Sequence, residues 1–263
     1  KITTLEGAEQ LIPGGPAASQ IAIKQLGTNG GGFFNVNSAH PFENPTPFSN
    51  FLQMLAIILI PAALTFSFGK MVGYLRQGVT LFLVMFLVWG AGLGFSIYSE
   101  YSMNPNFHQS GLMEGKETRL GVMNSLIWST VTTVASNGSV NSMHSSLSPL
   151  SGGVALFNMM LGEIIFGGVG AGMYGMLLFV LLTVFLSGLM VGRSPEYLGK
   201  KIEAYEMQWA ILGILGPCAV ILLGAALSAV LLIALSRVAN KGPHRFSEIL
   251  YAWPSAATNN GRA

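Results

Sequence analysis

Three Asn-Gly elements recur along this chain, and small polar residues surround each of them. They lie in Thr28-Asn29-Gly30-Gly31-Gly32, in Ser136-Asn137-Gly138-Ser139-Val140 and in Asn259-Asn260-Gly261. Glycine adopts backbone conformations that other residues avoid, so such a stretch can turn successive carbonyl oxygens toward one point. Carbonyl oxygens around an axis can replace the hydration shell of a cation. One Asn-Gly pair is only a common turn, so the hypothesis of a cation site depends on the repetition.

Each Asn-Gly element follows a moderately apolar segment that is too short to cross a bilayer. We expect these segments to be helices over residues 17–27, 121–135 and 247–258. A helix that ends inside a membrane leaves its last carbonyl groups without partners. Its partially negative C-terminal end favours a cation, and irregular backbone at that depth must lie inside protein or beside water. The pattern therefore predicts repeated units of a short helix and a pore-lining loop.

The scarcity of charge places these units in a membrane. Charged residues make up 9% of the 263 residues, hydrophobic residues make up 51%, and the mean hydropathy is +0.55. No Asp, Glu, Lys or Arg occurs between Glu43 and Lys70 or between Arg76 and Glu100. Because a spanning helix needs about 20 mostly apolar residues, we predict an all-α membrane protein. The expected spans are residues 51–68, 79–98, 176–191 and 210–235.

Other classes of function are excluded by the same composition. The net charge is +2 and the basic residues are scattered, which argues against nucleic acid as a partner. The single cysteine, Cys218, has no metal-ligand spacing. The sequence contains no GxxxxGK[ST] motif and no Asp-Lys-Thr-Gly phosphorylation motif. We therefore expect no catalytic chemistry in this chain.

A glycine-rich stretch is a candidate gate. Five glycines occur in residues 167–175, among them Gly167, Gly168, Gly170 and Gly172, and they disfavour a continuous helix. If all three loops open on one face, residues 150–166 and 176–191 must be two halves of one crossing. The alternative is that these glycines allow close packing between helices. Glu163, just before the break, is either a carboxylate on the ion pathway or one that is hydrogen-bonded to nearby backbone.

The basic residues before the second short helix have a simpler interpretation. We expect Lys116 and Arg119 to hold the outer part of the protein in place by pairing with Glu114 or Glu117. The four histidines lie in predicted polar loops without a second ligand at helical spacing, which favours solvated or packing roles over a metal site.

Five blocks resemble the potassium-binding A subunit of the bacterial Kdp potassium-transporting ATPases. They are LGTNGGGFFNVNSAHPFENPT (26–46), MEGKETRLGV (113–122), GEIIFGGVGAGMYGMLLFVLL (162–182), GLMVGRSPEYLGKKIE (188–203) and GPHRFSEILYA (242–252). The resemblance implies membrane–pore-loop–membrane repeats of the potassium channel and transporter superfamily. It also implies a fragment that holds the second, third and fourth filter loops and lacks the first repeat and the last span.

The resemblance further implies a function and a location. The transported ion would be K⁺, with no organic cofactor, and the chain would be a non-catalytic, multi-pass subunit in the bacterial inner membrane. Its partners would be a P-type ATPase catalytic subunit, small accessory membrane subunits and the lipid bilayer. The implied filter residues are Thr28, Asn29, Gly30, Gly31, Gly32, Ser136, Asn137, Gly138, Asn259, Asn260 and Gly261.

The expected division of the chain follows these units. Residues 1–50 would hold the pore helix, filter loop and outer segment of the second repeat. Residues 51–149 would hold a pair of spans, an outer loop, a pore helix and the third filter. Residues 150–263 would hold the broken span, a cytoplasmic loop, a further span, a pore helix and the start of the fourth filter. The alternatives are an autonomous potassium channel or symporter of the same superfamily, and a structural membrane subunit or solute permease.

Overall fold

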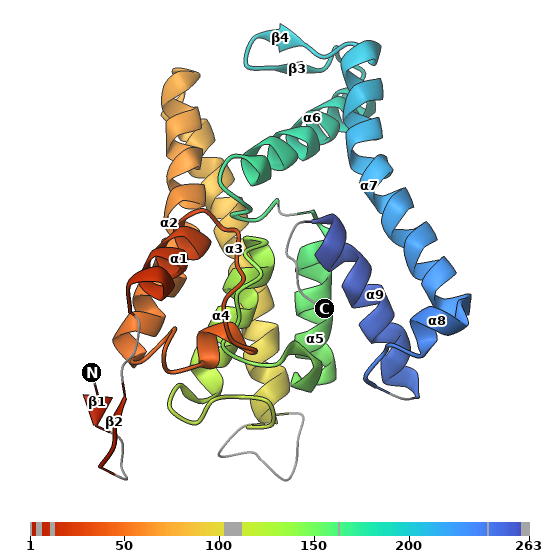
Figure 1. The fold of residues 1–263 in the computed structure, drawn as a ribbon. Coiled ribbons are helices and arrows are strands. Elements are labelled where there is room, and N and C mark those ends of the chain that lie inside the picture. Colours follow the sequence, from red (N-terminus) through yellow and green to blue (C-terminus); the bar gives the residue numbers. More distant parts are fainter. Residues whose placement is uncertain are drawn as a thin grey trace.

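The computed structural model describes residues 2–3, 7–10, 14–102, 112–162, 164–240 and 242–258, and most of these residues are helical (Figure 1). Among them, four helices are long and apolar enough to cross a membrane. These helices are α2 (Pro47–Met71), α3 (Leu75–Ser102), α6 (Ala171–Val191) and α7 (Ala204–Val230). Each coincides with one expected span, although α7 ends before residue 235. The all-α membrane fold is confirmed.

The three short helices expected before the Asn-Gly elements are also present. They are α1 (Gly14–Leu26), α4 (Gly121–Val134) and α9 (Pro243–Ala257). Helix α9 begins before residue 247 because Pro243 fits the first turn, where its missing N–H group is not needed. The remaining elements are short: α5 (Pro149–Met160), α8 (Leu232–Leu235), the 3-10 helices η1 (Asn37–Ala39) and η2 (His144–Ser146), β1 (Ile2–Thr3) with β2 (Glu9–Gln10), and β3 (Glu196–Tyr197) with β4 (Lys200–Lys201).

Helix α4 lies at the centre of the helical bundle. It contacts α2, α3 and α5, whereas α1 packs against α2, and α9 packs against α5 and α7. Leu126, Trp128 and Val134 of α4 are all 0% exposed. Its hydroxyl groups are also buried and bond to backbone, as when Thr133 Oγ1 donates to the Ser129 carbonyl at 2.7 Å. A short helix can therefore be surrounded by protein although it is too short to span a bilayer.

The predicted break is present, but its position differs from the prediction. Helix α5 ends at Met160 and α6 begins at Ala171, so the non-helical link lies before residue 171. Gly172 and Gly175 belong to α6 rather than to the break. The two helices lie in different halves of the molecule, with α5 beside α3 and α4, and α6 beside α2 and α7 (Figure 1). Glycines with positive φ lie at both ends of the link: Gly162, after α5, has a φ of +73°, and Gly170, before α6, has a φ of +97°, values that a side chain would disfavour.

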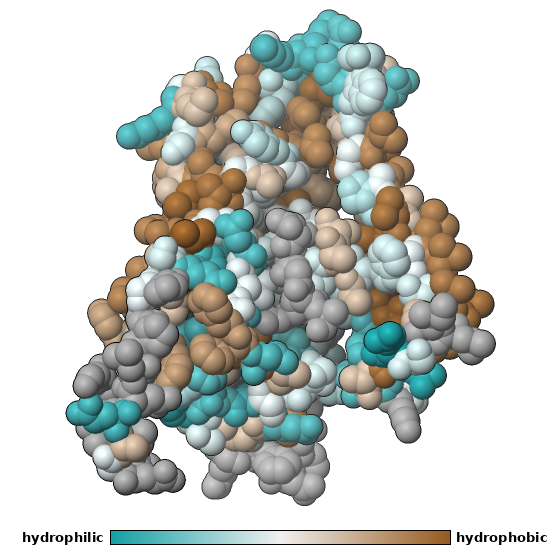
Figure 2. Space-filling view, in the orientation of Figure 1, coloured by the Kyte–Doolittle hydropathy of each residue, from teal (hydrophilic) through white to brown (hydrophobic). Residues whose placement is uncertain are grey.

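The outer surface has the polarity of a membrane protein. In Figure 2, hydrophobic side chains cover the sides of the molecule, and hydrophilic ones gather at the β3–β4 end and at the opposite end. Met190 on α6 is 88% exposed and Leu223 on α7 is 65% exposed. Soluble proteins rarely expose large contiguous apolar surfaces of this kind, so these helix faces are suited to lipid.

The crossing of α2 and α3 generates a stability prediction. A Cβ atom on Gly78 would overlap the Thr65 carbonyl oxygen and lie 3.2 Å from Gly69 Cα, whereas one on Gly90 would meet nothing within 4 Å. Gly78→Ala should lower the free energy of unfolding by about 1–3 kcal/mol through overpacking. Gly90→Ala, on the same helix, should leave it unchanged or raise it by up to about 1 kcal/mol. Thermal unfolding of the detergent-solubilised protein measures both, and equal midpoints for the two variants would contradict the predicted close contact.

Candidate functional site

The first two Asn-Gly loops begin with matching backbone φ angles. Thr28 and Ser136, the first residues of the two loops, both have a φ of +51°, which is uncommon for residues with a side chain. Gly30 and Gly138 follow with φ of +66° and +80°. The N–H of Asn29 donates to the Lys24 carbonyl at 3.1 Å, and that of Asn137 donates to the Thr132 carbonyl at 3.0 Å. The internal repeat expected from the sequence is therefore present in three dimensions at these two loops.

These two loops contact each other directly. A Cβ atom on Gly30 would overlap the Asn137 carbonyl oxygen and lie 2.7 Å from the Ser139 nitrogen. The Asn137 side chain donates from Nδ2 to the Lys24 carbonyl at 2.8 Å, and its Oδ1 accepts from the Ser139 N–H at 2.9 Å. Because α1 ends just after Lys24, the second loop supplies a hydrogen-bond donor to the helix of the first.

The C-terminal end of the third short helix, α9, contacts the second loop. Ser136 Oγ donates a hydrogen bond to the carbonyl of Thr258, the residue that ends α9. Asn259, Asn260 and Gly261, the predicted third loop, lie outside the described residues. The C-terminal ends of α1, α4 and α9 are thus joined by hydrogen bonds through residues of the second loop. Since each helix end is partially negative, this meeting point is electrostatically suited to a cation.

The predicted gate touches the first loop. Thr28 Oγ1 accepts a hydrogen bond from the Val169 N–H, in the link between α5 and α6, at 3.2 Å. Gly167 and Gly168 are buried, and Gly172 is buried in the first turn of α6. The link is anchored by Ile165 and Phe166, which pack in a cluster with Leu81, Met85, Val134 and Met173. Glu163 lies outside the described residues.

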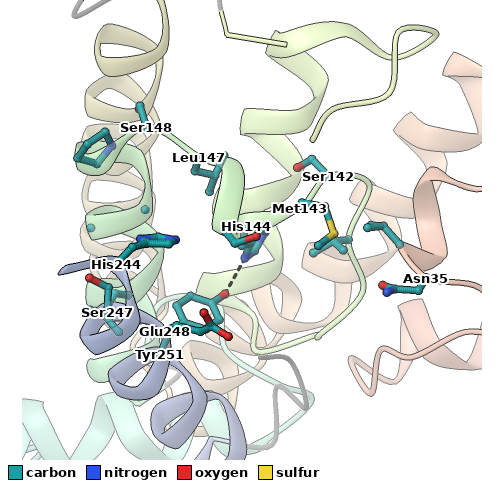
Figure 3. A pocket seen from close by; sticks show the side chains of 17 residues that line it. Asn35, Ser142, Met143, His144, Leu147, Ser148, His244, Ser247, Glu248 and Tyr251 are labelled. Carbon is teal, nitrogen blue, oxygen red and sulfur yellow. Dashed lines mark hydrogen bonds between the residues drawn. The ribbon is translucent and has the colours of Figure 1, made fainter. Parts of the chain in front are cut away.

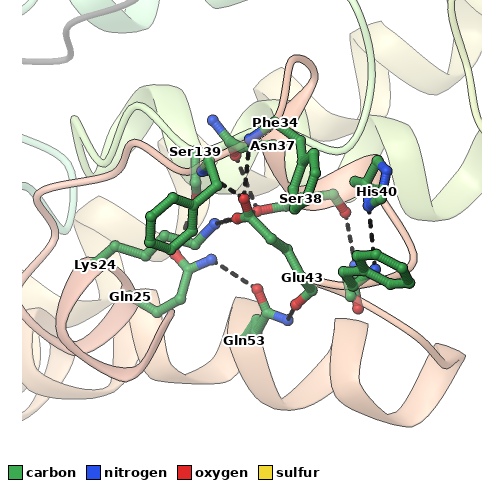
Figure 4. A network of polar contacts seen from close by, with 12 residues as sticks. Lys24, Gln25, Phe34, Asn37, Ser38, His40, Glu43, Gln53 and Ser139 are labelled. Atoms are coloured by element: carbon green, nitrogen blue, oxygen red, sulfur yellow. Dashed lines mark hydrogen bonds and ion pairs between the residues drawn. The ribbon is translucent and has the colours of Figure 1, made fainter. Parts of the chain in front are cut away.

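A buried polar network that the sequence did not predict lies behind the first loop. Its centre is an ion pair between Lys24 Nζ and Glu43 Oε2 at 2.5 Å, with both residues 1% exposed. Gln25, Ser38 and Gln53 extend it by hydrogen bonds (Figure 4). A lysine near the end of a short membrane helix must have a partner if it is buried. The sequence could therefore have predicted a buried partner for Lys24, although it could not have identified Glu43 as that partner.

The expected pairing of Lys116 was wrong. Lys116 Nζ lies 3.3 Å from Glu100 Oε2, with both side chains 0% exposed. Glu100 Oε1 also accepts from the N–H of Ser148, the residue before α5, at 2.8 Å. The expected pairing of Arg119 with Glu117 was correct, at 3.3 Å, and Arg119 also donates to the carbonyls of Ala39, Asn44 and Pro45.

A cavity of about 370 Å³ lies between α9 and the segment that follows the second loop (Figure 3). His144 Nδ1 and the Tyr251 hydroxyl are 2.6 Å apart across it. Glu248 also lines it, and although partial burial alone would raise its pKa, hydrogen bonds from Ala239 and Asn240 and the nearby His244 hold that pKa below its ordinary value. In the part of the chain that the structure describes, no three His, Cys, Asp or Glu side chains are grouped as metal ligands would be.

Comparisons with known proteins identify the family. The family model of the potassium-transporting ATPase A subunit matches residues 1–263. This chain belongs to that family. Proteins named potassium-transporting ATPase potassium-binding subunit are 60% identical to it over 260 residues in Leptospira interrogans and 59% identical over 267 residues in Pseudomonas aeruginosa. Each comparison covers 99% of this chain but 47% of the relative, so the chain spans about half the length of the relatives it matches.

The hydrogen bond from the Asn137 side chain to the Lys24 carbonyl generates a second prediction. Asn137→Asp replaces the Nδ2 donor with an oxygen that faces the Lys24 carbonyl, so a buried bond is replaced by two opposed acceptors. We expect the free energy of unfolding to fall by about 1–3 kcal/mol. Asn35→Asp, at an exposed position, is the matched control and should change it little. Thermal unfolding measures both, and equal stability of the two variants would show that the Asn137 bond contributes nothing.

Proposed function

We propose that this chain carries the potassium-selecting region of the potassium-binding subunit of an ATP-driven importer. The observation that carries the proposal is the convergence of two Asn-Gly loops and three helix C-terminal ends at one point. Backbone carbonyls of the loops would replace the hydration shell of K⁺. The proposed filter residues are Thr28, Asn29, Gly30, Gly31, Gly32, Ser136, Asn137 and Gly138, and the sequence adds Asn259, Asn260 and Gly261.

The lack of formal charge in the loops supports selection by carbonyl groups. None of the proposed filter residues is Asp or Glu, so the negative potential must come from the dipoles of backbone and uncharged side-chain groups. Dipoles give a graded field that can bind K⁺ and still release it. The carboxylate of Glu43 is held by Lys24 and by backbone N–H groups, which leaves it occupied as a hydrogen-bond acceptor.

We further propose that the link between α5 and α6 controls inward release. Its Val169 N–H donates to Thr28 Oγ1 at the start of the first loop, so a movement of the link would break this hydrogen bond or displace Thr28. Gly167, Gly168 and Gly170 would allow such a movement, with Gly172 in the first turn of the helix that follows. Glu163, which precedes these glycines in the sequence, would attract the ion. Potassium would then pass to a P-type ATPase catalytic subunit in the bacterial inner membrane, with small accessory membrane subunits in the complex.

The filter proposal is tested by adding a carboxylate to each loop. In the full-length protein, Gly30→Asp and Gly138→Asp should raise the KM for potassium uptake by about tenfold or more, which corresponds to a loss of about 1.4 kcal/mol of binding. A side chain on Gly30 would also meet the Asn137 carbonyl. Gly15→Asp is the matched control, since a side chain there meets nothing within 4 Å. The measurement is uptake in potassium-starved cells that contain equal amounts of each variant.

Two results would contradict the proposal. Unchanged uptake in both loop variants would contradict the filter hypothesis and favour a structural subunit or a permease for another solute. Potassium flux through the full-length protein without any ATPase partner and without ATP would instead support an autonomous channel or symporter.

A further inference from the structure

Glu43 touches the backbone of the first loop directly. Its Oε1 accepts hydrogen bonds from the N–H groups of Phe33 at 2.7 Å and Phe34 at 3.2 Å (Figure 4). In a trans peptide unit the carbonyl group points opposite to the N–H group. Both units are trans, so the carbonyl oxygens of Gly32 and Phe33 point away from Glu43. Gly31, Gly32 and Phe33 are exposed, so this part of the loop is open to the surface.

Gly32 lies against this carboxylate. A Cβ atom on Gly32 would be 2.6 Å from Glu43 Oε2 and 2.7 Å from Oε1. The loop therefore has no room to move toward Glu43. The carboxylate is itself immobilised, because Lys24 Nζ pairs with Oε2 and Gln53 Nε2 donates to the Glu43 carbonyl at 3.0 Å.

The same network reaches the second loop. Gln25 donates from Nε2 to Gln53 Oε1 at 2.8 Å, and Gln25 Oε1 accepts from Ser139 Oγ at 3.0 Å. This route reaches the main-chain carbonyl of Glu43. The carboxylate is connected to the second loop separately, because its partner Lys24 also donates to Ser38 Oγ, Ser38 donates to Asn37 Oδ1, and that oxygen accepts from the Val140 N–H. A carboxylate suits the position because it only accepts hydrogen bonds, whereas a glutamine would also present two N–H donors. Bonds from N–H groups to an ionised acceptor are also the stronger ones.

We propose that Glu43 is a positioning residue for ion selection. It orients the peptide units after the TNGGG sequence so that the carbonyl oxygens of Gly32 and Phe33 face the ion path, and Lys24 balances its buried charge. This inference rests on the proposed function, since it concerns the geometry of the same loop. Glu43 does not contact the ion itself.

The test compares two buried ion pairs of the described residues, in the full-length protein assembled with its ATPase partners. Lys24→Met/Glu43→Leu removes both charges and the acceptor, so that no unpaired charge stays buried. Lys24→Met/Glu43→Gln removes the charges but keeps one acceptor oxygen. Lys116→Met/Glu100→Leu is the matched control, because that pair is equally buried but contacts the start of α5 rather than the loop. The readouts are maximal rate and the ratio of the KM for Rb⁺ to the KM for K⁺.

We expect this ratio to fall by about tenfold in the Lys24→Met/Glu43→Leu variant and to fall less in the Lys24→Met/Glu43→Gln variant. It should stay at its wild-type value in the control. A purely structural role would lower the amount of complex or its maximal rate and leave the ratio unchanged. The proposal is overturned if either Glu43 variant that assembles keeps the wild-type ratio. It is also overturned if neither assembles while the control does, because the pair would then be a folding determinant.

The same experiment separates this inference from the proposed function. If the wild-type complex shows no K⁺ dependence, the proposed function fails. If the wild-type complex prefers K⁺ and the Glu43 variants keep that preference, only the role of Glu43 fails.

Discussion

Helices that end inside an apolar region leave carbonyl groups in need of donors, and this requirement governs the centre of the protein. The Lys24 carbonyl, near the end of α1, accepts from the N–H groups of Asn29 and Gly30 and from the Asn137 side chain. The Thr258 carbonyl accepts from Ser136. Water does not satisfy such groups within a bilayer, so neighbouring loops satisfy them. The loops are consequently bound to the helix ends that they face and cannot move independently.

The same requirement explains why the interior is unusually polar for a chain with so little charge. Asn50 Oδ1 accepts from Asn44 Nδ2 at 2.9 Å and from Asn141 Nδ2 at 3.1 Å, and all three side chains are 0% exposed. Irregular backbone beside the loops is therefore enclosed by amide, hydroxyl and ionic partners rather than by hydrocarbon. Networks of this kind favour one arrangement strongly, because each group that loses its partner carries the full cost of burial.

Local patterns predicted the elements of this fold better than the contacts between them. Long uncharged intervals indicated α2, α3, α6 and α7, and the Asn-Gly elements indicated that α1 and α4 end just before them. The break was placed too far along the chain because Gly172 and Gly175, although poor helix formers, lie within the strongly apolar helix α6. Lys24 and Glu43, like Lys116 and Glu100, are brought together only by the packing of helices. Neither pair has a spacing that one helix could explain, so spacing could not identify them.

The equal φ angles of Thr28 and Ser136 have a consequence for what each loop can contact. A ring of identical subunits gives every copy of a loop the same partners. Here the two residues have the same φ but different partners: Thr28 contacts the link before α6, and Ser136 contacts the end of α9. Because both loops belong to one polypeptide, no symmetry requires their contacts to match. Each loop can therefore bind a different neighbour at the same backbone position, which a ring of identical subunits cannot do.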